Sequence, residues 1–394
     1  MSISKDMKQS LTASSWIRKM FEEGARLSLE HGRENVCDFT LGNPNIAPPE
    51  KFFEVLGQCA DTKGKKVHGY MPNAGYPEVR REVALHIRQT QGVAVTENEV
   101  IMTCGAAGAL NVMLKAILDP GDTVVTPAPF FAEYVFYAKN HGGLLVTADT
   151  NADFSLNLDS LEKAITEKTK AVLINSPNNP TGAVYSLESL VQLGELLTKK
   201  SRQYNRTIYL LADEPYRDIV FDGLAVPSLF SVYPQTIVAF SYSKALSLPG
   251  ERIGWLALHP EAQYKGELMA AMTLANRILG FVNAPALMQR VVANLQGLFV
   301  DVSQYEKKRE ILCQGLAEAG YRFTKPSGGF YLFCPTPVED DIAFVQALAK
   351  ELILVVPGRG FAGPGHMRIA FCVEDAVIQK AIPGFKRVLE QFIR

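Results

Sequence analysis

The chain has 394 residues, of which 47% are apolar and 21% charged, and its formal net charge at pH 7 is −1. This length exceeds what a single hydrophobic core usually fills, so we expect two domains. A nearly neutral chain has no general attraction to nucleic acid or to an anionic membrane. The sequence also has no apolar run of the length that a membrane span or a signal peptide needs.

The cysteines and histidines argue against disulfides and against zinc. The six cysteines are scattered without a CxxC pair, and the six histidines lack the spacing of zinc ligands. Sparse cysteines in a long chain are typical of a reducing compartment. The sequence therefore predicts a cytoplasmic protein without a structural metal.

The first 31 residues predict a helical arm. Six apolar residues recur there at the spacing of one helix face, namely Trp16, Ile17, Met20, Phe21, Ala25 and Leu27. Residues 42–49 are rich in Pro and Asn and predict an extended loop. A helix is expected over 77–90, because this segment opens with proline and is amphipathic.

The middle of the chain predicts an α/β sheet. Helical patterns, for example over 107–118 and 187–200, alternate with short β-branched runs. The runs that predict strands are 100–103, 123–126, 144–147, 171–174, 208–212, 237–240 and 254–258. Such alternation favours a mostly parallel sheet that is covered by helices on both faces.

The pattern changes after about residue 290. Long helical patterns over 289–319 are followed by a hairpin-like stretch over 323–333 and by strands at 353–357 and 367–371. We interpret this region as a smaller α+β domain. The predicted division is an N-terminal arm and part of the small domain (1–48), a large domain (49–290) and a small C-terminal domain (291–394).

Polar motifs follow the predicted strands, at the edge where open α/β sheets carry their sites. Residues 105–108 (GAAG) start a helix whose free N–H groups suit a phosphate, although a plain tight turn is about as good an explanation. Residues 175–182 (NSPNNPTG) contain two prolines that fix the backbone and aim the asparagine amides, with an ordinary turn as the alternative.

Two further motifs carry charged side chains. Residues 213–216 (DEPY) place an acid at the end of a buried strand, which is costly unless a charged partner meets it; a helix N-cap is the alternative. Residues 241–244 (SYSK) place Lys244 directly after an apolar strand. Partial burial would favour the neutral amine that forms a Schiff base, whereas a surface lysine is the alternative. Four such motifs in one sheet indicate a single site.

Together with further motifs, these residues carry a specific resemblance. The chain also contains GYMPNAGYPEVR (69–80), KPSGGFYLF (325–333), VVPGRGF (355–361) and MRIAF (367–371). From about residue 39 to residue 371 it resembles the fold-type I pyridoxal-phosphate enzymes of the class I/II aminotransferase family, which are similar to aspartate aminotransferase. The resemblance implies a large domain with a mostly parallel sheet, a smaller α+β domain, and pyridoxal 5′-phosphate as cofactor.

The resemblance also implies roles for the residues that would hold the cofactor. Lys244 would form the Schiff base and move the substrate's α-proton. Asp213 would pair with the ring nitrogen, and Asn179 and Tyr216 would bond the 3′-oxygen. Phe131 would stack on the ring. If the alignment shifts by one residue, Phe130 takes this role instead.

The phosphate would be held by side chains that follow two of the strands and by backbone N–H groups. These groups belong to Ser241, Ser243, Arg252, Ala106 and Ala107. Many relatives have lysine, serine or threonine at the position of the two alanines. In this chain the phosphate would therefore depend more on backbone donors and on the two serines and the arginine.

The resemblance further implies how the substrate and a second chain would contribute. Arg368 would bind the α-carboxylate of the amino acid, beside the backbone of Gly42 and near Asn43 and Asn179. Tyr70 would reach the phosphate of a neighbouring subunit, which implies a homodimer. Without the resemblance, Tyr70 would be read as an ordinary turn residue.

These roles predict ping-pong transamination from an L-amino acid to a 2-oxo acid, with aspartate and 2-oxoglutarate as the first candidates. The alternative is a β-lyase or other Cα chemistry on the same scaffold. Arg277 is the one charged candidate for binding a distal carboxylate, but a solvated helix face explains it slightly better. Alanine, aromatic and other neutral donors therefore stay open.

Overall fold

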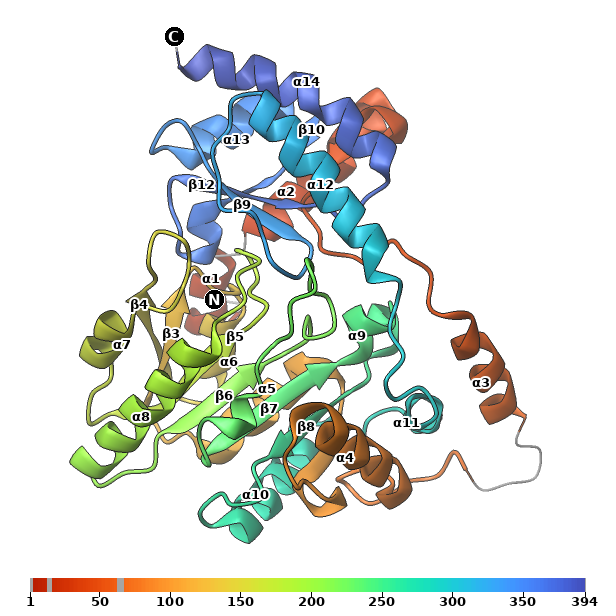
Figure 1. The fold of residues 1–394 in the computed structure, drawn as a ribbon, viewed down its shortest axis with the longest axis vertical. Helices are drawn as coiled ribbons and strands as arrows, with labels where there is room; N and C mark the ends of the chain where they lie inside the picture. Colours follow the sequence, from red (N-terminus) through yellow and green to blue (C-terminus); the bar gives the residue numbers. More distant parts are fainter. Residues whose placement is uncertain (1–2, 13–15, 62–66, 394) are drawn as a thin grey trace.

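The computed structural model describes residues 3–12, 16–61 and 67–393, and a seven-stranded sheet lies at the centre of its larger part (Figure 1). The strand order is β2-β8-β7-β6-β5-β3-β4. Strand β8 is antiparallel to both neighbours, and the other pairs are parallel. The strands are β2 (Val100–Thr103), β3 (Thr123–Ala128), β4 (Leu144–Asp149), β5 (Thr169–Asn175), β6 (Tyr209–Asp213), β7 (Thr236–Ser241) and β8 (Gly254–Leu258). The predicted mostly parallel α/β sheet is confirmed, with every predicted strand of this region present.

Helices cover both faces of this sheet, so its strands are apolar on both sides. In β6, Leu210 and Ala212 belong to one buried cluster, whereas Tyr209 and Leu211 belong to another. The first cluster is closed by α3 (Glu50–Ala60), α4 (Pro77–Gln91), α7 (Leu158–Ala164), α8 (Leu187–Gln203) and α11 (Ala286–Ala293). The second is closed by α5 (Gly105–Ile117), α6 (Tyr134–Asn140) and α10 (Lys265–Ile278).

A smaller part lies beyond one edge of the large sheet (Figure 1). Its strands form an antiparallel sheet of order β11-β12-β9 and a parallel pair, β1–β10. Its elements are α2 (Trp16–His31), β1 (Cys37–Asp38), α12 (Val302–Glu318), β9 (Tyr331–Pro335), α13 (Asp341–Lys350), β10 (Ile353–Leu354), β11 (Val356–Pro357), β12 (His366–Ala370) and α14 (Asp375–Phe392). One buried cluster joins Met20 and Leu27 near the N-terminus to Phe385 of α14. The predicted domain boundaries at residues 48 and 290 stay a prediction. The cluster agrees with them, because it joins residues before position 48 to residues after position 290.

One prediction for the C-terminal region is wrong. The helical patterns over 289–319 form two helices, α11 and α12; α11 ends at Ala293, and Asp301 caps α12 by accepting a hydrogen bond from the Ser303 N–H. The stretch over 323–333 does not form a hairpin. Its first half instead packs against a loop of the large part, where the Ser327 and Gly328 N–H groups donate to the Gly182 carbonyl.

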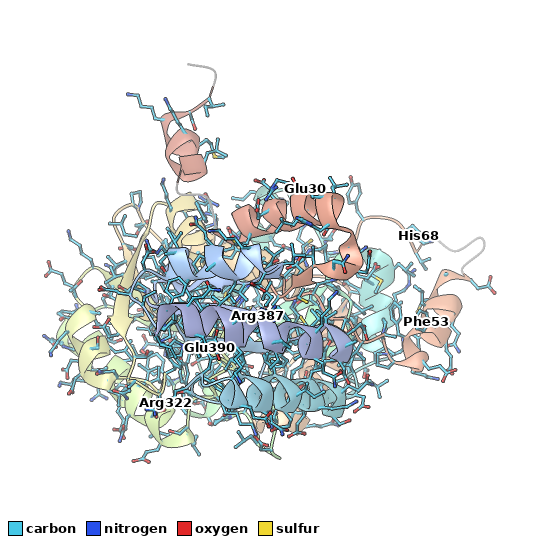
Figure 2. All side chains as sticks on the ribbon, turned by 90° about the horizontal axis from the view of Figure 1, so that it is seen from above. Glu30, Phe53, His68, Arg322, Arg387 and Glu390 are labelled. Carbon is cyan, nitrogen blue, oxygen red and sulfur yellow. The ribbon has the colours of Figure 1, made fainter. Side chains whose placement is uncertain are left out.

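The N-terminal arm consists of α1 (Lys5–Thr12) and α2, and α1 extends away from the body (Figure 2). Met20 and Leu27 are buried as predicted, but Ala25 is exposed and Gly24 faces Leu354 instead. The side chains at positions 16, 17 and 21 lie outside the described residues. In the described part of the chain, no helix is long and apolar enough to span a membrane.

Candidate active site

A cavity of about 310 Å³ opens at the edge of the large sheet where three parallel strands end and one antiparallel strand begins. Strands β5, β6 and β7 end at Asn175, Asp213 and Ser241, and the antiparallel β8 begins at the same edge just after Arg252. These residues line the cavity because parallel strands deliver their following residues to one edge of the sheet. Segments from the smaller part complete the wall, among them Gly42 and Arg368.

Lys244 projects into this cavity from α9 (Tyr242–Ala245), the short helix after β7. Its Nζ donates a hydrogen bond to the Gly42 carbonyl at 2.7 Å and lies 5.3 Å from the centre of the Phe330 ring. Burial lowers the pKa of Lys244 to about 8, and the positive charges of Arg368 and Arg252 act in the same direction. At pH 7 about a tenth of the side chain is therefore a neutral amine, far more than for a lysine with an ordinary pKa.

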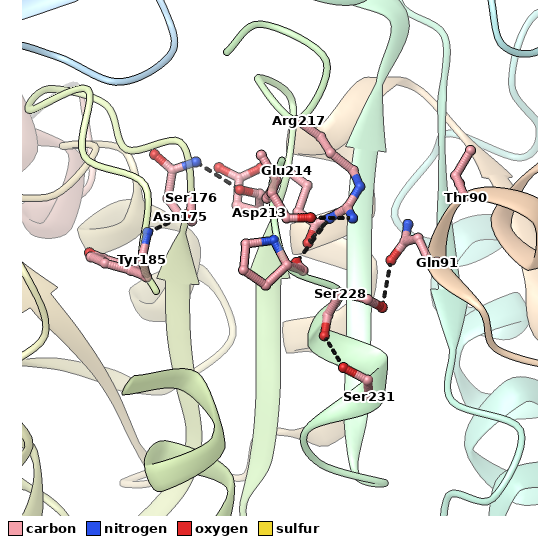
Figure 3. Close-up of polar contacts among 12 residues, drawn as sticks. Thr90, Gln91, Asn175, Ser176, Tyr185, Asp213, Glu214, Arg217, Ser228 and Ser231 are labelled. Atoms are coloured by element: carbon pink, nitrogen blue, oxygen red, sulfur yellow. Dashed lines mark hydrogen bonds and ion pairs between the residues drawn. The ribbon is translucent and has the colours of Figure 1, made fainter. Parts of the chain in front are cut away.

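Asp213 is a buried carboxylate that is half satisfied. The Tyr134 hydroxyl donates to Oδ2 at 2.6 Å, whereas Oδ1 is buried without a hydrogen-bond partner among the described residues. Burial raises the pKa of Asp213 to about 7, and the nearby charge of Glu214 adds to this effect. The Asn175 amide donates to the Asp213 carbonyl at 2.7 Å and fixes the backbone here (Figure 3). The free oxygen fits a ligand that brings an N–H donor.

Arg368 is a buried guanidinium that forms no ion pair with the described residues. Its Nη1 donates to Asn179 Oδ1 at 3.0 Å, its Nη2 donates to the Thr40 carbonyl at 2.6 Å, and its Nε has no partner. The guanidinium lies between the rings of Tyr331 and Phe361, at 4.4 and 4.5 Å from their centres. A buried positive charge held this way is placed to receive an anion.

Tyr216 lies between this arginine and the lysine. Its hydroxyl is 3.0 Å from the Tyr331 hydroxyl, and both rings are buried. A Cβ atom on Gly42 would overlap the Tyr331 hydroxyl, so the position requires glycine for the close approach of the backbone.

Another group of lining residues offers hydrogen-bond donors for an anion. Ser241 and Ser243 lie side by side, with 2.7 Å between their hydroxyl oxygens. Ala106 and Ala107 line the cavity in the first turn of α5, where backbone N–H groups have no partner within the helix. Gly105 has a φ of 70°, and a Cβ atom there would come within 3.0 Å of an Arg252 nitrogen. The glycine therefore leaves room for the guanidinium beside the helix start.

Phe131 lines the cavity, whereas Phe130 does not. The Phe130 ring is buried against Tyr134, with 6.4 Å between ring centres and an angle of 11°. Of the two alternatives for a ring-stacking residue, the geometry therefore favours Phe131.

Three other candidates do not line this cavity. Tyr70 is 96% exposed and makes no part of the wall. Asn43 lies next to Gly42 but is not a lining residue, and Arg277 lines a separate surface pocket with Asn73 and Arg80. The predicted site residues are otherwise gathered around one cavity: Gly42, Ala106, Ala107, Phe131, Asn179, Asp213, Tyr216, Ser241, Ser243, Lys244, Arg252 and Arg368.

Sequence reasoning missed several residues of the wall. Tyr331, Glu133 and Tyr137 line the cavity, whereas Tyr134 is not a lining residue but donates a hydrogen bond to Asp213. Tyr331 stood inside a recognised motif, and Tyr134 follows Phe131 in the same segment after a strand. Burial raises the pKa of Glu133, whose carboxylate forms no hydrogen bond with the described residues.

Comparison with known proteins identifies the class. The model of the family "Aminotransferase class I and II" matches residues 34–385, and the chain belongs to this family. The aspartate/prephenate aminotransferase of Thermus thermophilus is 32% identical over 92% of this chain and 93% of its own length. The aromatic-amino-acid aminotransferase 2 of Thermococcus litoralis is 30% identical over 95% of both.

Solved structures agree with this membership. An amino transferase from Eubacterium rectale has a TM-score of 0.96 and 38% identity over the full length of both chains. The aspartate aminotransferase of Thermus thermophilus with maleate has a TM-score of 0.86 and 28% identity over 99% of this chain and 100% of its own. The protein is therefore an aminotransferase, as its motifs predicted.

Proposed function

We propose that this aminotransferase works with pyridoxal 5′-phosphate bound in the cavity around Lys244, and that L-aspartate is its amino donor. One observation carries the cofactor proposal. A lysine with a lowered pKa, a buried carboxylate with a free oxygen and an arginine without an anion all line one cavity. Each is costly in a folded protein unless a ligand completes it.

The residues fit the chemistry of this cofactor at each of its ends. The free Oδ1 of Asp213 matches a protonated ring nitrogen, and Phe131 offers an apolar face for the ring. Arg252, the paired serines and the start of α5 offer donors for a phosphate. When bound, pyridoxal phosphate supplies an electron sink for the carbanion that forms at the substrate Cα.

The chain's own residues would do the remaining work. Arg368 would bind the α-carboxylate in two parallel hydrogen bonds and so hold the amino acid in one pose. The neutral amine of Lys244 would take the proton from Cα and later return it. Asp213 would keep the ring nitrogen protonated by holding a negative charge beside it.

Chemical trapping tests the cofactor proposal. We expect borohydride treatment of the protein with pyridoxal 5′-phosphate to attach the cofactor to Lys244, as read from peptide masses. Lys163→Ala, which changes an exposed lysine, should give the same product, and Lys244→Ala should give none. A protein that stays colourless with the cofactor, or a label on another lysine, would show the proposal to be wrong.

The choice of aspartate rests on relatives with aspartate in their names. A panel of amino donors with 2-oxoglutarate as acceptor tests it, with the conversion of the cofactor band as readout. Arg277 lines a separate pocket of its own chain, so the proposed contact for the distal carboxylate is the Arg277 side chain of a second copy. If aspartate reacts no better than alanine and Arg277→Ala changes neither, the aspartate proposal fails.

We also propose a homodimer and a cytoplasmic location. The exposed Tyr70 ring lies three residues before Asn73 and Ala74, which line the surface pocket that contains Arg277. We propose that a second copy covers this part of the surface. Light scattering of the purified protein tests the dimer, and a monomer would contradict it. Six free cysteines agree with a reducing compartment.

A further inference from the structure

A second cavity, of about 130 Å³, lies on the other side of the helix that carries Lys244. Helix α9 lines both cavities, with Ser243 and Lys244 in the first and Tyr242 and Ala245 in the second. The two share no lining residue. The remaining walls of the second cavity come from α4, Asp218, the end of β7 and the segment between α11 and α12. Cavities of about 150 Å³ can hold a ligand the size of benzene.

Two of the lining residues carry hydrogen-bond acceptors that no described residue donates to. The Asp218 carboxylate forms no hydrogen bond or ion pair with any described residue, and burial raises its pKa. Its neighbour Arg217 is not available, because the guanidinium donates to both oxygens of Glu214 at 3.1 Å and to two backbone carbonyls (Figure 3). The charge of Arg217 acts on Asp218 only through space and opposes the larger effect of burial on its pKa, so the carboxylate keeps free acceptor positions for a ligand N–H.

The second acceptor is the side-chain oxygen of Gln296. The Gln296 Nε2 donates to the Tyr242 hydroxyl and to the Val292 carbonyl, both at 2.7 Å. These two bonds use both hydrogens and fix the orientation of the amide. Oε1 is left buried without a partner among the described residues. The cavity therefore lacks donors at two points.

Aromatic rings and the Asp218 carboxylate favour a positive charge in this cavity, and the charge of Arg217, which is not a lining residue, acts on His86 and Asp218 from nearby. Phe240 and Tyr242 meet edge to face, with 5.3 Å between ring centres, and Phe299 is 52% exposed at the mouth. Aromatic faces bind ammonium groups. The lining residues include no lysine or arginine, and burial lowers the pKa of His86, which keeps its ring neutral near neutral pH.

We propose that this cavity binds a small organic ammonium ion that carries no carboxylate. Its N–H groups donate to Asp218 and Gln296, and its carbon atoms pack on the aromatic walls. An amino acid fits less well, because no lining residue offers a cationic partner for its carboxylate. A bare metal ion fits less well too, since the described residues hold no cluster of three His, Cys, Asp or Glu side chains.

Trimethylammonium chloride is the probe for the test, since the protonated tertiary amine has one N–H, enough for the bond to Asp218, and cannot condense with an aldehyde. Its binding therefore reports on this cavity and not on the candidate active site, so the two proposals fail separately. Calorimetric titration of the holoenzyme should show saturable binding. Asp218→Asn should weaken it by about tenfold or more, the effect of losing one charge-assisted hydrogen bond. Asp159→Asn, which changes an exposed acid on α7, should bind like the unchanged protein.

Two controls separate a site from a general effect. Sodium chloride at equal concentration accounts for ionic strength, and tert-butanol is a neutral molecule of similar size. Binding of trimethylammonium that exceeds both, and that Phe299→Ala also weakens, supports the proposal. The proposal is overturned if the heat equals that of sodium chloride, if tert-butanol binds equally well, or if Asp218→Asn binds with unchanged affinity.

Discussion

Asp213→Asn is expected to change the stability of the cofactor-free protein, because in that protein the Asp213 carboxylate is a buried charge without a cationic partner among the described residues. Folding raises the pKa of this carboxyl from 3.8 to about 7. Below about pH 4 the group is neutral in both the folded and the unfolded chain. As the pH rises to about 7, the unfolded chain loses the proton first, so the folded state becomes less stable over this window.

The size of the effect follows from the pKa shift. At about 1.4 kcal/mol per pKa unit, the ionised carboxylate costs the empty protein about 4 kcal/mol above about pH 7. Asparagine removes this cost and still accepts the bond from Tyr134, but its NH₂ group lacks a partner, which costs about 1–3 kcal/mol. We therefore expect the variant to be more stable than the unchanged protein by about 1–3 kcal/mol near pH 8.

Urea unfolding followed by circular dichroism measures this difference at about pH 8 and at about pH 4.5. The gain in stability should vanish at the lower pH, and the variant should lose its transaminase activity with cofactor present. Asp159→Asn serves as the matched control and should stay within about 0.5 kcal/mol at both pH values. A variant with the same or lower stability at about pH 8 would refute the reasoning.

Three further changes have defined outcomes. Tyr134→Phe removes the hydrogen bond that the described residues donate to the Asp213 carboxylate and should lower kcat/KM by about 10- to 100-fold. Steady-state kinetics measures the rate and circular dichroism checks that the fold is intact; an unchanged rate would contradict the role of this bond. Arg368→Lys should lower kcat/KM by about 100-fold, mainly through KM for the amino acid, because lysine cannot form the two parallel bonds; an effect on kcat alone would contradict carboxylate binding. Gly42→Ala should destabilise the protein by about 1–3 kcal/mol in urea unfolding, because the new Cβ overlaps the Tyr331 hydroxyl; a neutral effect would show that the loop shifts freely.

The sequence predicted the sheet and the lining of the cavity because both depend on local patterns. Strand residues such as Leu210 and Leu211 are apolar in succession, and the polar residues that follow each strand necessarily reach one edge of a parallel sheet. Motif resemblance then identified residues that come from distant segments, such as Arg368.

The missed features depend on contacts between segments that sequence periodicity does not encode. The bond between Tyr134 and Asp213 joins positions 79 residues apart, and that between Tyr216 and Tyr331 joins positions 115 apart. The predicted role of Tyr70 involves a neighbouring subunit and stays a prediction.

The arginine between two rings also has a consequence for synthesis. Arg368 and both rings that flank it come from beyond residue 330, whereas Asp213, Ser241 and Lys244 come from the middle of the chain. As the polypeptide leaves the ribosome, the groups proposed to hold the cofactor are therefore complete about a hundred residues before the carboxylate clamp exists. A nascent chain stalled in this interval could take up the coenzyme but would have no grip on an amino acid.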